Sequence, residues 1–512
     1  MFLQNLRGTK LSLAIALAGA SAWILQGYDQ AIMNGLLTMK TFETQFPTLN
    51  TSRPGVNKEH ATVIEGTVVA IYELGCVLGC VASYFFGDKL GRRRFIMTVC
   101  TITIIGVIIQ TTSYHITQLI IARVITGVGV GGITATVPTY ISESAPARLR
   151  GKLVLLCGSL AIFGVALATW VDFGFYFVKH SSVNWRFPIA LQMLFPIICI
   201  SLILFLPESP RWLVKVGRTD EAAEVFARLE DKPVDSDQVQ GEISLIQQSL
   251  LEDPAAIKAS PFSRTKNKHL RRSLMAIGLN IGAQMTGINI VTFYSTSIFE
   301  QQLGYSSVEA RIFSGCLQIW QAMCAFAAIF LIDIFGRRYA MIHAAAIMGI
   351  CQFILGGLAS DLENPATAKA MVAFYFVAMY AFPVGLLLVV FMYAAEIAPL
   401  ESRGQITAIS TACNWLFNFL VAEASPTAFN NIGYKYYFVY GSVAFVLLAC
   451  LILFFPETRD RSLEEIDDIF IQSQTLFDTV RIAKTMPVQG DADYDPEKKL
   501  SFETKDVVDY VE

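Results

Sequence analysis

The segment Tyr140-Ile-Ser-Glu-Ser-Ala-Pro-Ala-Arg-Leu-Arg-Gly151 indicates the architecture, because its skeleton returns in the second half as Tyr393-Ala-Ala-Glu-Ile-Ala-Pro-Leu-Glu-Ser-Arg-Gly404. Both copies read Y-x-x-E-x-x-P-x-x-x-R-G. Two further pairs recur in the same order, namely 88–93 with 333–338 and 207–209 with 456–458. Repeats in register indicate two homologous halves, and the apolar runs between them indicate membrane bundles.

The composition places the chain in a membrane. Of its 512 residues 54% are hydrophobic and 16% are charged, whereas about a quarter of the residues are charged in soluble domains. A net charge of −3 gives no support for nucleic-acid binding. The ten cysteines all fall in apolar runs, so we expect neither a disulfide framework nor a metal site. No cofactor is predicted.

The apolar runs predict the architecture. A spanning helix needs about 20 residues, and the runs that meet this length are 11–35, 63–86, 95–112, 116–138, 152–178, 187–206, 273–299, 309–332, 339–359, 370–395, 405–425 and 436–455. We therefore predict an all-α membrane protein with 12 transmembrane helices in two six-helix bundles. The predicted parts are a first bundle at 1–206, a linker with short helices at 207–272, a second bundle at 273–456 and a tail at 457–512.

Basic residues predict the orientation, because they favour cytosolic loops. With alternating helices one side receives all the clusters, which are Arg7, Lys10, Lys89, Arg92, Arg93, Arg94, Arg148, Arg150, Lys152, Arg337 and Arg338. Both termini and the tail are then cytosolic, and the 36–62 loop is external, where Asn50 opens an Asn-Thr-Ser glycosylation tripeptide.

A competing interpretation makes residues 1–22 a cleaved signal peptide, since Arg7 and Lys10 precede an apolar stretch that ends in Ala-Ser-Ala. Its removal would leave an odd number of helices. It would also place the cluster Arg92 to Arg94 outside, against the charge rule.

Two charges inside apolar runs predict a proton site. Lipid does not solvate a carboxylate, so Asp29 needs a partner. Arg123 lies at a similar depth, roughly 10 Å below the outer surface at about 1.5 Å per residue. We expect an Asp29–Arg123 ion pair in which protonation of Asp29 changes helix packing. The alternative is a permanent pair that only fixes helix register. We expect Glu73 to pair with a polar group between helices, and the alternative for Glu73 is a place in the proton path.

The repeated segments carry acids and arginines where helices leave the membrane. We expect interbundle salt bridges that form a cytosolic gate, closed when the protein opens outward. Its predicted members are Arg92, Arg93, Glu143, Arg150, Arg337, Arg338, Glu396 and Arg403. Simple anchoring by positive charge is the alternative.

The linker and the tail differ in pattern. Residues from Thr219 and around Ile243 show helical apolar spacing, which predicts short amphipathic helices. The charged tail is expected to become disordered after about residue 475.

Uncharged amides in the second half predict a binding site. Gln284 and Asn289 lie in one span, Gln318 and Gln321 in the next, and Asn414, Trp415 and Asn418 in the eleventh. Amides and aromatic rings around one cavity suit a neutral polyhydroxylated ligand, because each hydroxyl needs donors and acceptors. The alternative is hydrogen bonding between helices by the same amides.

These motifs together resemble the sugar porter family of the major facilitator superfamily, especially its fungal members. The resemblance rests on the following segments: Gly27 to Asp29, Asp88 to Arg93, Arg123, Pro138 to Gly151, Pro207 to Trp212, Gln284 to Tyr294, Asp333 to Arg338, Glu396 to Gly404, Asn414 with Trp415, and Pro456 to Thr458. It implies alternating access, proton coupling through Asp29 with Arg123, and sugar binding mostly by the second bundle. The implied contacts are Gln284, Asn289, Tyr294, Gln321, Phe391, Asn414 and Trp415.

Several of these positions depart from the family pattern. A helix-five glutamine is replaced by Cys157-Gly158, a helix-eight asparagine by Gln321, and the helix-ten tryptophan region by Leu388 to Phe391. Each unpaired hydroxyl would cost roughly 1–3 kcal/mol. Glycerol, other small polyols or a less polar metabolite therefore become candidates beside hexoses.

The sequence thus predicts a monomeric plasma-membrane proton symporter for a neutral sugar or polyol, and not an enzyme. The competing functions are a facilitative uniporter, a metabolite exporter, and a nutrient receptor that signals through its tail without transport.

Overall fold

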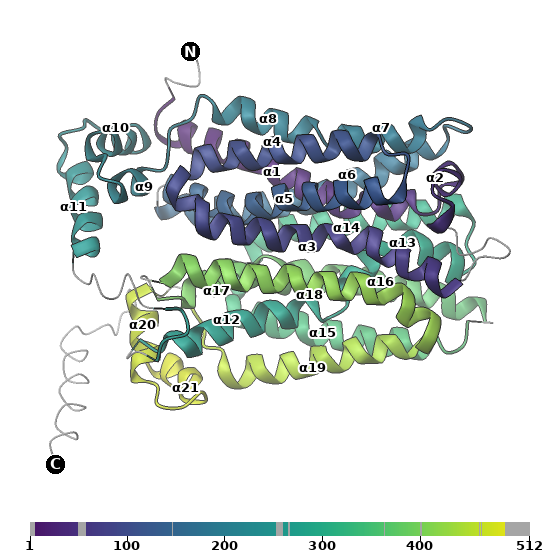
Figure 1. The fold of residues 1–512 in the computed structure, drawn as a ribbon. Coiled ribbons are helices and arrows are strands. Elements are labelled where there is room, and N and C mark those ends of the chain that lie inside the picture. Colours follow the sequence, from purple (N-terminus) through teal and green to yellow (C-terminus); the bar gives the residue numbers. More distant parts are fainter. Residues whose placement is uncertain are drawn as a thin grey trace.

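The computed structural model describes residues 6–49, 58–145, 147–251, 260–264, 267–362, 364–399, 402–459, 461 and 463–486. Within these ranges every regular element is a helix. The helices lie side by side in two groups, with the first half of the chain above the second in Figure 1.

The first bundle holds the helices of the N-terminal half. They are α1 (Gly8–Leu36), α3 (Lys58–Leu90), α4 (Arg92–Thr111), α5 (Ile116–Glu143), α6 (Ala147–Tyr176), α7 (Val183–Leu191) and α8 (Leu194–Ile203). The predicted span 187–206 is therefore two helices, interrupted at Gln192 and Met193. A short α2 (Lys40–Gln45) and the turn η2 (Pro47–Leu49) follow α1.

The second bundle repeats this order with two broken spans. Its helices are α12 (His269–Gln284), α13 (Ile288–Ser297), η4 (Ile298–Gln302), α14 (Ser307–Phe335), α15 (Arg337–Leu358), α16 (Pro365–Phe382), η5 (Pro383–Leu387), α17 (Val389–Ile397), α18 (Arg403–Ile432) and α19 (Lys435–Phe454). Between α12 and α13 the chain turns through Gly287 at φ +83°. That backbone conformation favours glycine, and it gives Asn289 a place in the first turn of a new helix.

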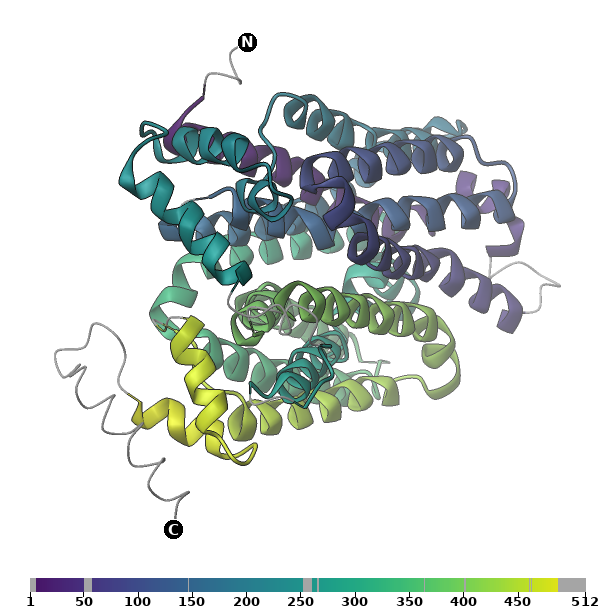
Figure 2. The ribbon, with the colours of Figure 1, turned by 60° about the vertical axis from the view of Figure 1, so that its left-hand side comes forward.

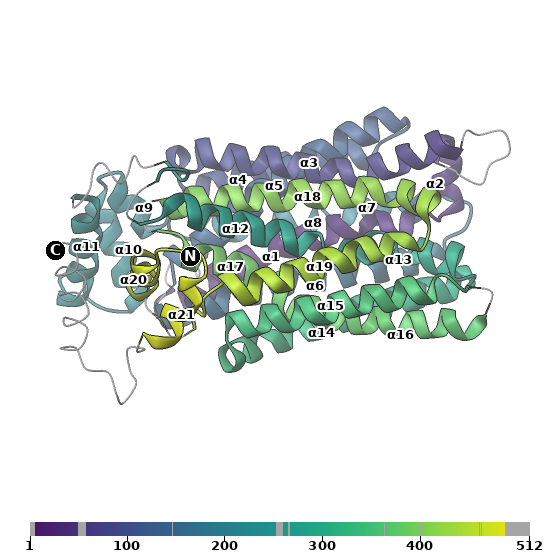
Figure 3. The ribbon, with the colours of Figure 1, turned by 90° about the horizontal axis from the view of Figure 1, so that it is seen from below.

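Eleven helical segments of the described chain are long and apolar enough to cross a membrane. α18, the eleventh span in chain order, falls outside that set. It begins with Arg403, carries Glu423 within its second half and has several amides along its length. It nevertheless packs along α3 and lies beside it in Figure 3. The prediction of an all-α membrane protein with two bundles is confirmed.

The linker and the tail form helices at one end of the bundles. They are α9 (Pro210–Lys215), α10 (Thr219–Glu230), α11 (Asp237–Leu251), α20 (Leu463–Gln472) and α21 (Asp478–Thr485). We call this end the linker face and the opposite end, which carries α2, the loop face (Figures 1 and 2).

The prediction of disorder after about residue 475 is wrong as far as residue 486. α21 is held by Thr479, which donates a hydrogen bond to the carbonyl of Phe454, and by Arg461, which donates to the carbonyls of Ala483 and Met486. The charged composition of this segment does not reveal these tertiary contacts. Residues 487–512 lie outside the described chain.

Glycines allow the closest helix packing in the first bundle. A Cβ on Gly75 of α3 would lie 2.4 Å from the carbonyl oxygen of Val124, and one on Gly79 would lie 2.2 Å from that of Val128. α3 and α5 therefore touch backbone to backbone. This contact places Arg123 of α5 against α3.

Candidate functional site

Asp29 of α1 and Arg123 of α5 form an ion pair inside the first bundle. The Arg123 Nη1 lies 3.1 Å from the Asp29 Oδ1, and both side chains are fully buried. Arg123 also donates to the carbonyls of Val68 and Val69 on α3, at 3.0 and 2.9 Å. The Asp29 Oδ2 has no hydrogen-bond partner among the described residues, so one carboxylate oxygen is left to receive a proton.

The ion pair is linked to the second bundle by two aromatic rings. The Arg123 guanidinium lies over the Tyr72 ring, 4.9 Å from its centroid. Tyr72 in turn meets the Trp415 ring of α18 edge to face, with centroids 6.2 Å apart. Its neighbour Glu73 is fully buried, and neither carboxylate oxygen has a partner within the described chain. Sequence spacing gave no signal for this link, because it crosses between bundles.

A cluster of buried amides lies on α12, α13 and α18. Gln284 donates to the Asn414 Oδ1 at 3.0 Å, and Asn414 donates to the Asn280 Oδ1 at 3.2 Å. Asn289 donates to the Gln284 Oε1 and, at 2.6 Å, to the Asn418 Oδ1. The structure therefore brings together Gln284, Asn289 and Asn414 as expected. It adds Asn280, whose position one turn before Gln284 on the same helix was a signal in the sequence.

Two glutamines on α14 are buried without full pairing. Both side-chain amide atoms of Gln318 and the Oε1 of Gln321 have no partner among the described residues. The Trp415 Nε1 is likewise buried and unpaired. Buried polar atoms of this kind require an explanation, and a bound solute or water supplies one. Phe391 of α17 is partly buried against the hydrophobic core.

Tyr294 lies apart from the amide hydrogen bonds. Its hydroxyl donates to the carbonyl of Ala422 at 2.9 Å. The ring lines a pocket toward the loop face together with Thr62 and Glu65 of α3. Tyr294 thus reaches a contact between the bundles.

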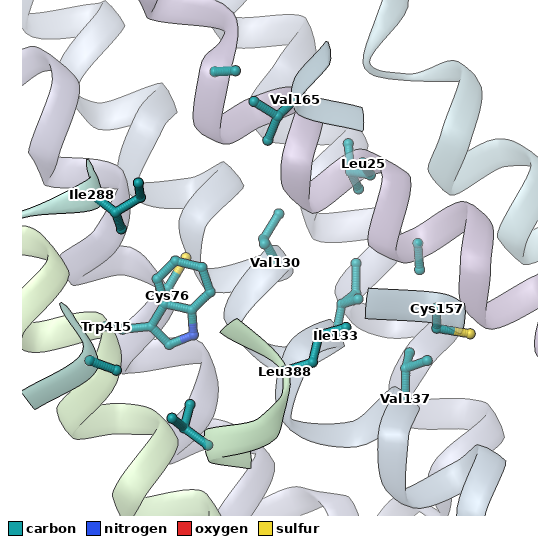
Figure 4. Packing of buried hydrophobic residues seen from close by; sticks show 14 of the residues in the cluster. Leu25, Cys76, Val130, Ile133, Val137, Cys157, Val165, Ile288, Leu388 and Trp415 are labelled. Carbon is teal, nitrogen blue, oxygen red and sulfur yellow. The ribbon is translucent and has the colours of Figure 1, made fainter. Parts of the chain in front are cut away.

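Two of the departures from the family pattern touch each other. A Cβ on Gly158 of α6 would lie 2.0 Å from the Leu388 Cδ2. Leu388 also lies beside Ile133, in an apolar region that includes Val130 and Trp415 (Figure 4). Cys157 faces the other way, since its thiol lies 3.6 Å from the Ala16 carbonyl oxygen.

The repeated motifs build the same clamp at the linker face of each bundle. Tyr140 donates to the carbonyl of Pro207 at 2.6 Å, and Tyr393 donates to that of Pro456 at 2.8 Å. Gly91 and Gly336 have nearly equal φ, +84° and +86°. Each glycine precedes a helix whose first backbone N–H groups donate to a glutamate of the matching Pro-Glu segment. Glu208 accepts from the Arg93 N–H in the first bundle, and Glu457 accepts from the N–H groups of Arg337 and Arg338 in the second. Burial raises the pKa of Glu208, while the Arg93 N–H lowers it.

The acids of the predicted gate pair inside their own bundles. Glu143 accepts two hydrogen bonds from Arg92, both at 3.1 Å, and Glu396 lies 3.5 Å from the Arg337 Nε. Each acid thus lies next to an arginine of its own bundle. The gate was predicted to close across the bundles only when the protein opens outward, and this arrangement has its loop face closed, so that pairing stays a prediction.

The remaining gate arginines point to backbone oxygens where the structure describes them. Arg93 donates to the carbonyls of Ile203 and Leu204, Arg338 to that of Ile452, and Arg403 to that of Ala398. The Arg150 side chain and the glycosylation candidate Asn50 lie outside the described part of the chain.

At the loop face the bundles are joined by hydrogen bonds that the sequence did not reveal. Asn34 of α1 donates to the Ser295 Oγ at 2.9 Å and to the Ser314 Oγ at 3.2 Å, and its Oδ1 accepts from the Thr296 N–H. These contacts hold α1 against α13 and α14.

A buried arginine adds a second junction there. Arg311 of α14 donates to the Gly35 carbonyl at 2.9 Å and to the Thr38 Oγ1 at 2.6 Å, and its guanidinium lies over the Tyr176 ring. Asp172 of α6 is buried close by, and its carboxylate has no hydrogen-bond partner among the described residues. Arg311 was inside a predicted span, so its charge was the missed signal.

Comparison with known proteins gives a consistent family. The family described as "Sugar (and other) transporter" matches residues 14–470. The Sugar transporter STL1 of Saccharomyces cerevisiae is 34% identical over 475 residues, covering 92% of this chain and 83% of the relative. The High-affinity fructose transporter ght6 of Schizosaccharomyces pombe is 28% identical, covering 90% and 86%.

Solved structures agree with the sequence relatives. The proton:xylose symporter XylE bound to 6-bromo-6-deoxy-D-glucose superimposes with a TM-score of 0.76 at 25% identity, over 90% of this chain and 100% of that structure. The resemblance inferred from the sequence is thereby confirmed. The chain belongs to the sugar transporter family of the major facilitator superfamily, whose members are membrane transporters and not enzymes.

Proposed function

We propose that this protein imports a small neutral polyol or sugar across the plasma membrane by proton symport, with alternating access of the two bundles. The linker face is cytosolic in this proposal, so both termini lie inside the cell. The protein acts as a monomer, with protons as the coupling ion and no cofactor.

One observation carries the coupling. A series of contacts runs from Asp29 through Arg123 and Tyr72 to Trp415. The residue before Trp415 in α18 is Asn414, which belongs to the amide cluster. Proton binding and solute binding therefore act on side chains that touch across the bundles. XylE, the structural relative, is itself named as a proton:xylose symporter.

The geometry suggests how a proton changes the packing. Protonation of the free Asp29 Oδ2 removes the negative charge that faces Arg123. Arg123 keeps its two bonds to the carbonyls of Val68 and Val69. The Arg123 guanidinium then remains bound to α3, while α1 loses its ion pair with Arg123. Because α1 also joins the bundles at the loop face through Asn34, this loosening changes how the two bundles pack against each other.

The substrate class follows from the uncharged cluster. Five amides supply donors and acceptors without a net charge, which suits hydroxyl groups and excludes a carboxylate or an ammonium as the main recognised group. The contact of Leu388 with Gly158 fills space with apolar atoms. Glycerol and other small polyols therefore fit this site better than a hexose that needs a partner for every hydroxyl.

The test is uptake by transporter-null cells that express the protein. A panel of glycerol, D-glucitol, pentoses and hexoses identifies the solute, and addition of that solute should make the medium more alkaline. Accumulation that a protonophore leaves unchanged would replace symport by facilitated diffusion. Efflux without uptake would identify an exporter, and signalling without flux would identify a receptor.

A further inference from the structure

A pocket opens toward the loop face between the bundles. Its volume is about 530 Å³, within the range of roughly 300–1,000 Å³ typical of small-molecule sites. Thr62 and Glu65 of α3 form one wall. The opposite walls come from α13, η4 and α18 and include Tyr294, Gln301 and Phe429.

We propose that this pocket is a separate binding site for a polyhydroxylated solute, outside the central amide cluster. The Glu65 carboxylate accepts hydrogen bonds from two hydroxyls, and the amides of Gln301, Gln302 and Asn430 donate and accept further ones. A carboxylate and amides beside aromatic rings match a solute with adjacent hydroxyl groups and an apolar carbon face.

The aromatic walls are fixed before a solute arrives. The Tyr294 hydroxyl is held by the Ala422 carbonyl, so its ring keeps one orientation. Phe429 packs against Tyr436 and Tyr437, with ring centroids 5.3 and 5.5 Å apart. Because these side chains are already ordered, binding costs less conformational entropy, and more of the free energy of contact appears as affinity.

The pocket is distinct from the central cluster. Tyr294 lies five residues beyond Asn289 on α13, which is about 7 Å along a helix at about 1.5 Å per residue. The lining of the pocket shares no residue with Gln284, Asn289 or Asn414. A solute there occupies a space nearer to the loop face.

Both bundles form the pocket, so it belongs to the arrangement with a closed loop face. Asn430 donates to the Thr62 Oγ1 at 2.9 Å beside it, and Thr67 donates to the Glu423 Oε1 at 2.8 Å one turn further along α3. A solute bound between these walls stabilises the closed arrangement by mass action. The site stands whether or not the transporter is coupled to protons.

The experiment measures access to the pocket in the purified full-length protein in lipid nanodiscs, where both faces meet the solution. Gln301 is exposed and lines the pocket, so a Gln301→Cys thiol reports occupancy through its rate of modification by a charged methanethiosulfonate reagent. The background carries Asn414→Ala to weaken the central cluster. Ser182→Cys, exposed before α7 and outside the pocket, is the matched control.

We expect D-glucitol to slow modification at position 301 several-fold and saturably, with no effect at position 182 and none from glycine betaine, which has no hydroxyl. Adding Glu65→Gln, which keeps the shape and removes the charge, should raise the half-protecting concentration about tenfold, because hydrogen bonds to charged groups are the stronger ones. Two results would overturn the proposal. One is that D-glucitol does not slow modification at position 301 in the Asn414→Ala background, and the other is that Glu65→Gln leaves the half-protecting concentration unchanged. Neither result bears on proton coupling, which the uptake assay tests.

Discussion

Leu388 of α17's N-terminal flank occupies the space that a side chain at Gly158 of α6 would fill, with only 2.0 Å between the Leu388 Cδ2 and a Cβ built on Gly158. The two residues are more than two hundred positions apart in the sequence and belong to different bundles. Because these two departures from the family pattern contact each other, they act together. At this place an apolar contact replaces polar side chains.

This contact predicts a compensating pair. Gly158→Gln alone should lower the yield of folded protein, because the new side chain overlaps Leu388. Leu388→Ala alone should cost about 2–5 kcal/mol through the cavity that it leaves. The double variant should recover stability and raise the ratio of hexose to glycerol uptake about tenfold, since one regained hydrogen bond is worth about 1–2 kcal/mol. Additive losses in the thermal unfolding of the double variant would contradict the contact.

Asp29→Asn should abolish accumulation against a gradient while solute exchange continues. The amide keeps the shape of the side chain but cannot take up and release a proton, so Arg123 stays without its counter-charge through the cycle. Accumulation and counterflow of the identified solute, measured between pH 5 and 8, separate the two effects. Asp220→Asn, which changes an exposed carboxylate in the first turn of α10, is the control. Normal accumulation by Asp29→Asn would remove the assignment of this carboxylate.

Asn280→Ala should raise the KM of the identified solute, although Asn280 was not predicted as a contact. The Asn280 Oδ1 accepts a hydrogen bond from the Asn414 amide, so its removal leaves that amide without its acceptor. A hydrogen bond worth about 1 kcal/mol corresponds to an increase in KM of about fivefold. Initial uptake rates give KM and the maximal rate separately. Gln352→Ala, which removes a bond to the Thr286 carbonyl on the α12–α13 turn, tests whether a structural amide has the same effect. A KM that stays constant in Asn280→Ala would place this residue outside the site.

Arg311→Ala should destabilise the closed loop face. The variant removes two bonds between the bundles and leaves the buried Asp172 carboxylate without its nearby cation, a loss of roughly 3–5 kcal/mol for a buried charge. Arg311→Ala combined with Asp172→Asn should regain most of the melting temperature. The double variant should still label faster than the parent at a cysteine placed at Ser295, which lies in the same junction. Equal melting of the single and double variants would show that the two groups do not interact.

Much of the fold was predictable because lipid imposes simple requirements. Long apolar runs and repeated charged motifs located the helices and the two bundles, including α18 at the predicted span 405–425. Helix breaks were harder to predict. The turn at Gly287 interrupts the predicted span 273–299 at a glycine, whereas the break at Gln192 and Met193 has no glycine or proline at that position.

The site was predictable only in part. Charges within spans indicated Asp29 and Arg123, and amides at helical spacing indicated Gln284, Asn289 and Asn414. Contacts between bundles depend on the rotation of each helix about its axis, which the sequence pattern does not determine. The Tyr72–Trp415 contact, the position of Tyr294 and the pairing of Glu143 and Glu396 within their own bundles were therefore accessible only in three dimensions.

The duplicated clamps at the linker face bear on the energetics of the transport cycle. Each tyrosine, glycine and acid engages only its own half of the molecule, so these bonds persist unchanged when one half tilts against the other. The activation barrier must then reside in the contacts between the halves that are exchanged during the tilt, among them those around Asn34 and Arg311. Substitutions in the clamps should alter folding yield, and substitutions around Asn34 and Arg311 should alter turnover.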